Sequence, residues 1–324
     1  MFYKNTRVCV CVCYSPKGFK VFVFHLFILL FVLLIGSYYI LACYFYQYLY
    51  KFYEEKVTLY SFFCRIICYN IFNTNYIYAK EGVNSMKIFR RIILILLVIV
   101  IVVGSTCYVN GKKLYDIKLS EISLDKKVES IRASDTFISL GDLPEYYKNA
   151  VVAVEDHRYY NHGAIDVIAL GRAIVSNVKQ KDFKEGGSTI TQQTAKNMYF
   201  ITEDDVVSRK VAEAILSFEL EHKYSKDEIL ELYINTIYFG DGYYGIKEAC
   251  EGYLKKSPKD MTIYDATMLA GIPNAPSIYA PTVNFNLTQS RQKKVVSSML
   301  EYKYINQDQA NELFEKINNA TYSK

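Results

Sequence analysis

One apolar run near the N-terminus constrains this chain more than any other feature. From Ile92 to Tyr108 no charged residue occurs, and the run reaches the roughly 17 residues that a helix needs to cross a bilayer. Lys87, Arg90 and Arg91 cluster just before it, so the positive-inside rule places that side in the cytoplasm and the following domain outside. We expect a transmembrane anchor over residues 86–108.

A cleaved signal peptide is the rival interpretation of this run. Signal peptidases cut after small residues in an Ala-x-Ala-like pattern. The nearest candidate in this chain, from Gly104 to Thr106, matches that pattern poorly. The sequence therefore favours an anchor that is retained in the mature protein.

Residues 1–85 are rich in Phe, Tyr, Ile and Cys, and they contain a second apolar run from Phe19 to Phe45. This run could be a further span, with an outside N-terminus and a basic cytoplasmic loop. We favour the hypothesis that Met86 is the natural start and that residues 1–85 are translated upstream sequence. Residues 80–83 can be encoded by a purine-rich stretch that resembles a ribosome-binding site. An intact mass that begins at Met1 would contradict this hypothesis.

Composition narrows the class of protein to which the chain can belong. The 324 residues are 51% hydrophobic with a mean hydropathy of +0.04, and the apolar excess lies in the two N-terminal runs. The net charge of +5 suits an anionic membrane surface or phosphate-bearing substrates. The sequence has no basic stripe with interleaved aromatic residues, which would have indicated nucleic-acid binding. Most of the eight cysteines precede residue 86, so Cys107 and Cys250 are expected to be unpaired.

The rest of the chain is expected to be mainly α-helical. Residues 109–140 are mixed and charged, and we expect a membrane-proximal connector of low regular structure there. Residues 141–324 form the expected enzyme domain, in which apolar residues recur at helical spacing without strand–helix alternation. Capping boxes, Thr189 with Gln192 and Ser225 with Glu228, mark two helix starts. Helices are expected after Pro144 and over 166–178, 189–200, 206–224, 225–239, 245–254, 264–270, 289–302 and 307–317.

The first segment that carries chemistry runs from Glu155 to Gly163. Glu155 and Asp156 end an apolar helix, and only one of them can face a given site because helix neighbours point about 100° apart. Glu155 extends the apolar face, which predicts partial burial and a raised pKa, as a general base or acid needs. A capping or surface acid is the alternative interpretation. His162 is expected to be a structural hydrogen-bonding residue beside the turn at Gly163.

The second segment, from Glu185 to Asn197, places glycines before a helix that begins with hydroxyl residues. Exposed backbone N–H groups at such a start favour an anion. Gln192 and Lys196 are four residues apart, so an amide and a cation share one helix face. The segment predicts a diphosphate cradle, and an ordinary capped helix is the alternative.

The third segment holds Arg209, Lys210 and Glu213. Arg209 and Glu213 are four residues apart and could simply pair on a helix surface, an interaction worth only about 0.2–0.5 kcal/mol. The functional interpretation instead places Glu213 in the same cleft as Glu155, with the two cations facing substrate phosphate. A fourth segment places Asn235 and Tyr238 one turn apart on a helix that is otherwise expected to be core.

Each signal is weak alone, but their order and spacing together resemble the five motifs of the family 51 glycosyltransferases. This family comprises the peptidoglycan polymerase modules of class A penicillin-binding proteins and the monofunctional transglycosylases. Its EDxxFxxHxG pattern resembles residues 155–163, with Tyr159 in place of Phe and one residue fewer before Gly163. Residues 186–197 resemble the GGSTITQQxxKN motif, and residues 209–213 resemble RKxxE. The IxExYxN motif resembles residues 229–235, and the last motif resembles residues 245–281. The resemblance covers residues 130–305; Leu254-Lys255 replaces the usual Phe-Gly, and the Asp205 loop lacks a basic residue found in some members.

The resemblance implies a lysozyme-like helical domain with a small membrane-proximal lobe from residues 165–200. It implies that Glu155 is the general base on the acceptor sugar's 4-hydroxyl, which attacks the anomeric carbon of the donor with inversion to a β-1,4 bond. Lipid II and the growing lipid-linked glycan would be the substrates, undecaprenyl diphosphate would be released, and Glu213 would be the second catalytic carboxylate. The residues implied in substrate binding are Asp156, Arg158, Ser188, Thr189, Gln192, Lys196, Arg209, Lys210, Asn235 and Tyr238.

The resemblance also implies a divalent cation, Mg²⁺ or Mn²⁺, beside the departing diphosphate, and no organic cofactor. No residue is assigned as a metal ligand. The expected location is the bacterial cytoplasmic membrane, with one membrane pass and an extracytoplasmic catalytic domain. The membrane and other cell-wall synthesis and division proteins are the expected partners, and nucleic acid is not. The combined Ser-x-x-Lys, Ser-x-Asn and Lys-Thr-Gly constellation of a transpeptidase is not present, so a monofunctional enzyme is expected, with a truncated bifunctional gene as the alternative.

Two other classes of function stay open at this point. A lysozyme-like hydrolase would also use two carboxylates, and it would shorten purified glycan strands. An inactive scaffold in a cell-wall complex would share the membrane anchor. The cations near residues 186–197 favour a diphosphate donor over hydrolysis, and a scaffold has no use for two acids and Lys196 in a cleft.

Overall fold

The computed structural model describes residues 85–180 and 187–321; the expectations for residues 1–84, Glu185 and Gly186 lie outside the described residues. The chain divides into two units, residues 1–97 and 98–324, of which the second contains the helical domain. The described residues are mainly α-helical, as predicted, and they form no sheet. Their isolated bridge joins Tyr238 and Tyr244.

The first described element, α4, is a helix from Ser85 to Glu121 that contains the predicted anchor. Residues Phe89–Glu121 are long and apolar enough to cross a membrane, judged by length and composition. Large apolar side chains along this stretch, such as Leu94 and Val100, are exposed. An apolar helix whose side chains are not covered by protein is what a lipid environment accommodates.

The prediction of a connector with low regular structure over residues 109–140 was wrong. α4 continues to Glu121 and α5 covers Leu124–Arg132, so only a short stretch before residue 140 is without helix. Packing overrides the weak local propensity of this segment. The hydroxyl of Tyr115 donates to the carboxylate of Glu219, and Lys118 pairs with Glu203 at 2.8 Å.

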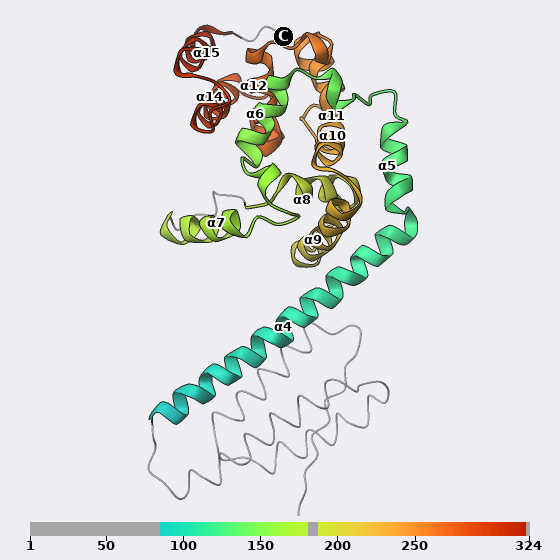
Figure 1. Cartoon of the computed structure of the whole chain (residues 1–324), viewed down its shortest axis with the longest axis vertical. Helices are drawn as coiled ribbons and strands as arrows, with labels where there is room; N and C mark the ends of the chain where they lie inside the picture. Colours follow the sequence, from blue (N-terminus) through green and yellow to red (C-terminus); the bar gives the residue numbers. More distant parts are fainter. Residues whose placement is uncertain (1–84, 181–186, 322–324) are drawn as a thin grey trace, which may run out of the picture. The chain divides into compact units, whose positions relative to one another are not determined.

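Two groups of helices form the domain (Figure 1). In one group α6 (Glu145–Glu155), α12 (Ile263–Gly271), α14 (Phe285–Glu301) and α15 (Gln307–Asn319) pack together. In the other, the short α8 (Ile190–Ala195) packs against α9 (Val206–Lys223) and α10 (Lys226–Thr236), and η3 (Lys196–Phe200) continues α8 as a π-helical turn. The remaining elements are α7 (Val167–Gln180), α11 (Gly245–Ala249), α13 (Pro276–Tyr279), η1 (Leu140–Asp142), η2 (Tyr159–Asn161), η4 (Cys250–Leu254), η5 (Pro258–Asp260) and η6 (Ile272–Asn274).

The ends of the helices follow local side-chain chemistry. Both predicted capping boxes, at Thr189 and at Ser225, are confirmed. α10 ends three residues earlier than predicted, because the backbone of Ile237 is extended (φ −70°, ψ 142°). α14 begins four residues earlier than predicted, because the side chain of Asn284 accepts a hydrogen bond from the Leu287 N–H at 3.2 Å and caps the helix.

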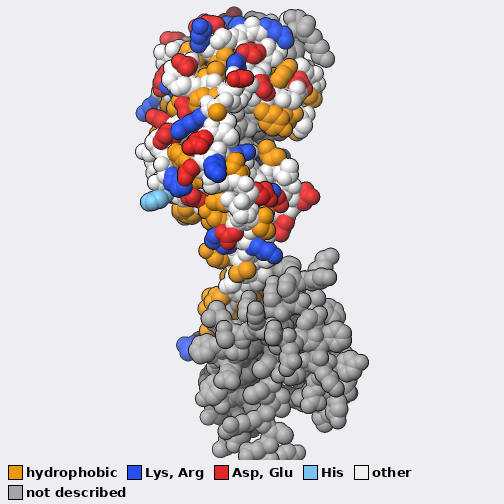
Figure 2. Space-filling model, turned by 90° about the vertical axis from the view of Figure 1, so that its right-hand side faces the viewer, with side chains coloured by type: hydrophobic (Ala, Val, Ile, Leu, Met, Phe, Trp, Pro, Cys, Tyr) orange, Lys and Arg blue, Asp and Glu red, His pale blue; other side chains and the backbone are white. Residues whose placement is uncertain are grey.

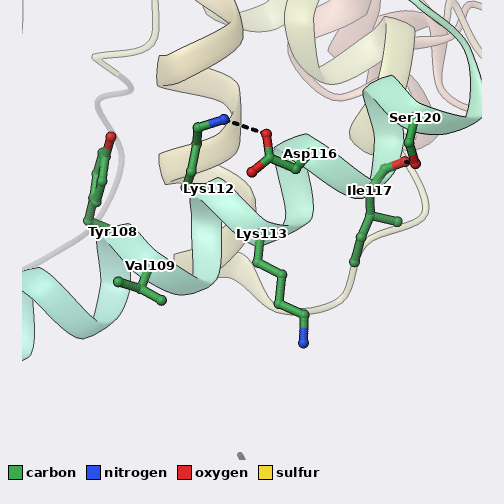
Figure 3. Close-up of a pocket in the computed structure, with 7 residues that line it drawn as sticks. All are labelled: Tyr108, Val109, Lys112, Lys113, Asp116, Ile117 and Ser120. Carbon is green, nitrogen blue, oxygen red and sulfur yellow. Dashed lines mark hydrogen bonds and ion pairs between the residues drawn. The ribbon is translucent and has the colours of Figure 1, made fainter. Parts of the chain in front are cut away.

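On the face drawn in Figure 2, the described residues of the helical domain show basic and acidic side chains interspersed with apolar ones. A hollow of about 490 Å³ is lined by residues of α4 between Tyr108 and Ser120, whose side chains are drawn in Figure 3. None of the residues that were predicted to carry chemistry lines it. Cys107 and Cys250 are free thiols, which confirms that they are unpaired.

Gly111 sets how closely α4 approaches α9. A Cβ atom at this position would overlap the side chain of Val211 and would lie 3.0 Å from the carbonyl oxygen of Ser208. Gly104, earlier on the same helix, has open space around it. The close approach therefore depends on a missing side chain at position 111 and not at position 104.

We expect Gly111→Val to destabilise the folded protein by about 1–3 kcal/mol, because the added side chain forces α4 away from α9. The thermal unfolding midpoint of the full chain in detergent measures this loss. Gly104→Val is the matched control and should leave the midpoint nearly unchanged. Equal midpoints for the two variants would contradict the account of this contact.

Candidate active site

Glu155 is a buried carboxylate at the C-terminal end of α6. The helix buries Ala150 to Ala153 against the core, and this delivers Glu155 with only 8% of its side chain exposed. Oε2 accepts a hydrogen bond from Nε2 of Gln193 at 2.9 Å, and Oε1 lies 3.4 Å from Nη2 of Arg291. Burial raises the pKa of Glu155, while the Gln193 hydrogen bond and the Arg291 charge oppose that rise. The predicted burial and raised pKa are confirmed.

Asp156, the next residue, has a different task. Its Oδ1 lies 2.8 Å from Nε2 of His162, and its Oδ2 accepts the backbone N–H of Ile190 at 3.1 Å. Nδ1 of His162 lies 2.6 Å from the carbonyl oxygen of Gly163, so the structural role predicted for His162 is confirmed. Asp156 therefore ties the end of α6 to the start of α8, and both of its oxygens are engaged within the protein.

Arg158 pairs with a second buried acid. Its Nε lies 3.3 Å from Oδ2 of Asp166, which is 2% exposed. Oδ1 of Asp166 accepts the backbone N–H groups of Ile168 and Ala169 at the start of α7. Burial works against ionisation here, but those two hydrogen bonds and the Arg158 charge lower the pKa of Asp166. Arg158 and Asp166 together hold the start of α7.

Among the described residues, one cluster of two acids and a histidine could hold a divalent cation. Asp156, His162 and Asp166 bring ligand atoms within 4.8 Å of one another. A metal would have to displace the contact between His162 and Asp156 and compete with the Arg158 guanidinium for Asp166. In the structure these atoms hold the starts of α7 and α8, and the divalent cation expected beside the diphosphate stays a prediction.

The start of α8 is fixed by Thr189. Its Oγ1 accepts the Gln192 N–H at 3.1 Å and donates to the carbonyl oxygen of Ala164 at 2.8 Å. The Thr189 N–H donates in turn to Oε1 of Gln192 at 3.0 Å. Gln192 thus completes the capping box with its side-chain oxygen, and its role in a diphosphate cradle stays a prediction.

Three cations interact with a second buried acid, Glu213. Glu213 is fully buried on α9; Nζ of Lys210 lies 2.7 Å from its Oε2, and Nε of Arg209 lies 3.3 Å from its Oε1. Nζ of Lys210 also donates to Oγ of Ser188 at 3.2 Å. Burial lowers the pKa of Lys196; Arg209 and Lys210 act in the same direction, and Glu213 opposes them. We call Lys196, Arg209 and Lys210 the cation cluster.

The segment formed by α8 and η3 connects the two buried acids. Gln193 contacts Glu155, and Lys196 interacts electrostatically with Glu213. Residues three apart on a helix lie on one face, so Gln193 and Lys196 point to the same side of this segment. The structure therefore brings Glu155 and the cation cluster to one stretch of chain.

Asn235 and Tyr238 make their contacts elsewhere. The amide group of Asn235 accepts from and donates to the backbone of Ile138, at 2.8 and 2.9 Å. Tyr238 lies beyond the end of α10, so the predicted helical turn between the two residues does not form, and its ring packs on Tyr244 with centroids 4.8 Å apart. These contacts hold the segment before η1 and the turn after α10.

Sequence reasoning missed the two side chains that hold Glu155. Gln193 stands inside the motif from residue 186 to residue 197, but helix spacing gave no reason to prefer it over Gln192. Arg291 lies 136 residues from Glu155 along the chain, and no local pattern marks it. Only the packing of α14 against α6 brings it to the site.

We expect Asp156→Ala to lower the free energy of unfolding by about 1–3 kcal/mol, because it leaves the buried N–H of Ile190 and the His162 ring without their partner. Thermal unfolding in detergent measures this change. Asp142→Ala removes an exposed acid and is the control. An Asp156→Ala protein as stable as the control would contradict the bridging role.

Comparison with known proteins gives matches over this region. Residues 124–300, more than half of the chain, match the family model described as "Transglycosylase". Penicillin-binding protein 1A of Neisseria lactamica is 43% identical over 189 residues, which cover 58% of this chain and 24% of that protein. Penicillin-binding protein 1F of Bacillus subtilis (strain 168) is 41% identical over 173 residues, covering 53% and 24%. The matched region thus spans about a quarter of these relatives.

A solved structure of penicillin-binding protein 1A from Haemophilus influenzae also matches. It is 22% identical, covers 58% of this chain and 18% of that chain, and gives a TM-score of 0.35. The family resemblance that the motifs predicted is confirmed by the family match over residues 124–300.

Proposed function

Because this chain belongs to the transglycosylase family, we propose that it is a peptidoglycan glycosyltransferase that polymerises lipid II into β-1,4-linked glycan strands. One observation carries the proposal: on the segment formed by α8 and η3, Gln193 donates to the buried carboxylate of Glu155, and Lys196 interacts electrostatically with Glu213, Arg209 and Lys210. A sugar transfer from a diphosphate needs a base at the attacking hydroxyl and positive charge at the leaving group.

Glu155 is the general base in this proposal. Its carboxylate takes the proton from the 4-hydroxyl of the acceptor sugar as that oxygen bonds to the anomeric carbon of the donor. The bond from the anomeric carbon to the lipid diphosphate breaks on the opposite face, so the configuration inverts. Its raised pKa supports this role, because a base is most effective when its pKa approaches the working pH.

The cation cluster receives the leaving group. Lys196, Arg209 and Lys210 would hold the diphosphate of the donor and stabilise the charge that develops as undecaprenyl diphosphate departs. Ser188, which already accepts a hydrogen bond from Lys210, would lie at the same place. Glu213 is fully buried, so we assign it the task of holding Arg209 and Lys210 in position.

The membrane supplies the lipid-linked substrate. We propose that α4 anchors the chain over residues 86–108, that residues 109–140 join it to the catalytic domain at 141–324, and that this domain lies outside the cytoplasm. Val167, Ile168 and Leu170 on α7 are exposed apolar side chains, which supports insertion of the lobe from residues 165–200 into the lipid surface. Other cell-wall synthesis and division proteins are proposed partners.

We expect Glu155→Gln to reduce glycan polymerisation by at least about 100-fold, because the neutral amide accepts no proton. Lipid II binding should be largely unchanged. Gel analysis of polymer formed from lipid II in detergent measures the effect. Polymer formed at the wild-type rate would refute the role of Glu155, and shortening of purified glycan strands by the wild-type protein would favour a hydrolase.

The Glu155→Gln variant should remain folded. The direction of its change in stability follows from the raised pKa of Glu155. Because the folded-state pKa is raised above the ordinary 4.5, the folded protein binds this proton more tightly than the unfolded chain, and stability falls as pH rises through the raised value. A neutral glutamine avoids that cost. The thermal midpoint of Glu155→Gln at neutral pH should therefore equal or exceed that of the wild type.

We expect Lys196→Met to lower kcat by about 100-fold or more, because it removes a donor to the charge that develops on the departing diphosphate. Its binding of lipid II should weaken as well. Steady-state kinetics of polymerisation check both effects. Lys259→Met, which changes an exposed lysine outside the cluster, is the control, and equal kinetics for the two variants would contradict the role of the cluster.

A further inference from the structure

Arg291 reaches the base from a helix that carries none of the sequence motifs' acids or cations. It lies on α14, and its Nη2 is 3.4 Å from Oε1 of Glu155. Both side chains are almost completely buried, with 10% of Arg291 and 8% of Glu155 exposed. At such burial the two groups are shielded from solvent, so their geometry is set by the protein.

The guanidinium is fixed at its other end. Nε of Arg291 donates to the carbonyl oxygen of Gly271 at 3.3 Å, and Cζ lies 5.8 Å from the centre of the Tyr279 ring. A Cβ atom at position 271 would come within 3.0 Å of Cγ of Arg291, so the glycine leaves room for the arginine stem. The planar group is therefore held in place before any substrate binds.

Arg291 and Gln193 address different oxygens of Glu155. Gln193, on α8, donates to Oε2 at 2.9 Å, and Arg291 faces Oε1. Each carboxylate oxygen has two lone pairs, so one on each oxygen is left to accept a proton. Donors from two helices on two oxygens fix the rotation of the carboxylate, which one donor alone would not do.

Three ionisable groups face Glu155 from the elements around it. Arg291 on α14 favours its charged form, and the adjacent Asp156 disfavours it. Tyr233, on α10, is the third; its buried hydroxyl has no hydrogen-bond partner among the described residues. Arg291 is the only cation of these three.

We propose that Arg291 is a positioning residue that, together with Gln193, holds the Glu155 carboxylate in the orientation and charge state in which it accepts the acceptor's proton. This inference rests on the proposed function. Arg291 itself touches neither substrate nor the reacting atoms in this account. It acts on the reaction only through Glu155.

The test is the pH–rate profile of lipid II polymerisation by the full chain in detergent. In Arg291→Gln, kcat should fall by about 10–100-fold while KM changes little, because a misplaced base costs rate without weakening binding. The acid limb should move to higher pH, because loss of the cation raises the pKa of Glu155. Arg291→Lys should restore the position of the acid limb but only part of kcat, since an ammonium lacks the planar fork.

A merely structural arginine would give a different result. It would lower the thermal midpoint and the rate at every pH, with the acid limb unmoved, and this outcome would overturn the proposal. Lys294→Met, an exposed change on the same helix, should match the wild type. If Arg291→Gln fails to fold, Arg291→Lys decides alone: a reduced kcat at wild-type KM supports positioning, and an unchanged kcat overturns it. If the wild type forms no polymer, the proposed function itself fails.

Discussion

The site depends on keeping one carboxylate ionisable in a place where water cannot solvate it. Burying a charge is costly unless polar groups in the protein replace the lost hydration. Glu155 meets this demand with donors from two other helices, Gln193 on α8 and Arg291 on α14. The packing of α6 against α14 and the anchoring of α8 therefore set the surroundings of the proposed base as well as the fold.

Two adjacent acids have different roles: Glu155 is the proposed base, and Asp156 holds neighbouring elements together. Glu155 and Asp156 are adjacent in the sequence, but α6 ends between them and their side chains lie in different surroundings. One carboxylate oxygen of Asp156 bonds to His162 and the other accepts the N–H of Ile190, in the first turn of α8. These bonds fix the helix that carries Gln193. Glu213 has a comparable supporting role, because its buried carboxylate pairs with Arg209 and Lys210. The proposed base therefore depends on Asp156 through α8, and two cations of the cluster pair directly with Glu213.

Most helix starts and the burial of Glu155 could be predicted from the sequence, because the signals for them are local. Capping boxes, helical spacing and the paired acids fixed most helix starts and the burial of Glu155. Long-range packing escaped prediction: past residue 108, Tyr115 and Lys118 of α4 contact Glu219 and Glu203, and Arg291 reaches Glu155 only through the tertiary fold. The side-chain oxygen of Gln192 completes a helix cap and the amide of Asn235 holds Ile138, and the substrate-binding roles expected for these two residues stay predictions.

The central claim is that sugar chemistry and diphosphate binding occur along one face of the α8 segment. The most direct measurement is an experimental structure of the protein with a non-reactive lipid-linked disaccharide diphosphate. The account predicts the diphosphate against Lys196 and Lys210, with a sugar hydroxyl within hydrogen-bond distance of the Glu155 carboxylate. A diphosphate bound away from these lysines, or a glycan that leaves Glu155 uncontacted, would contradict it.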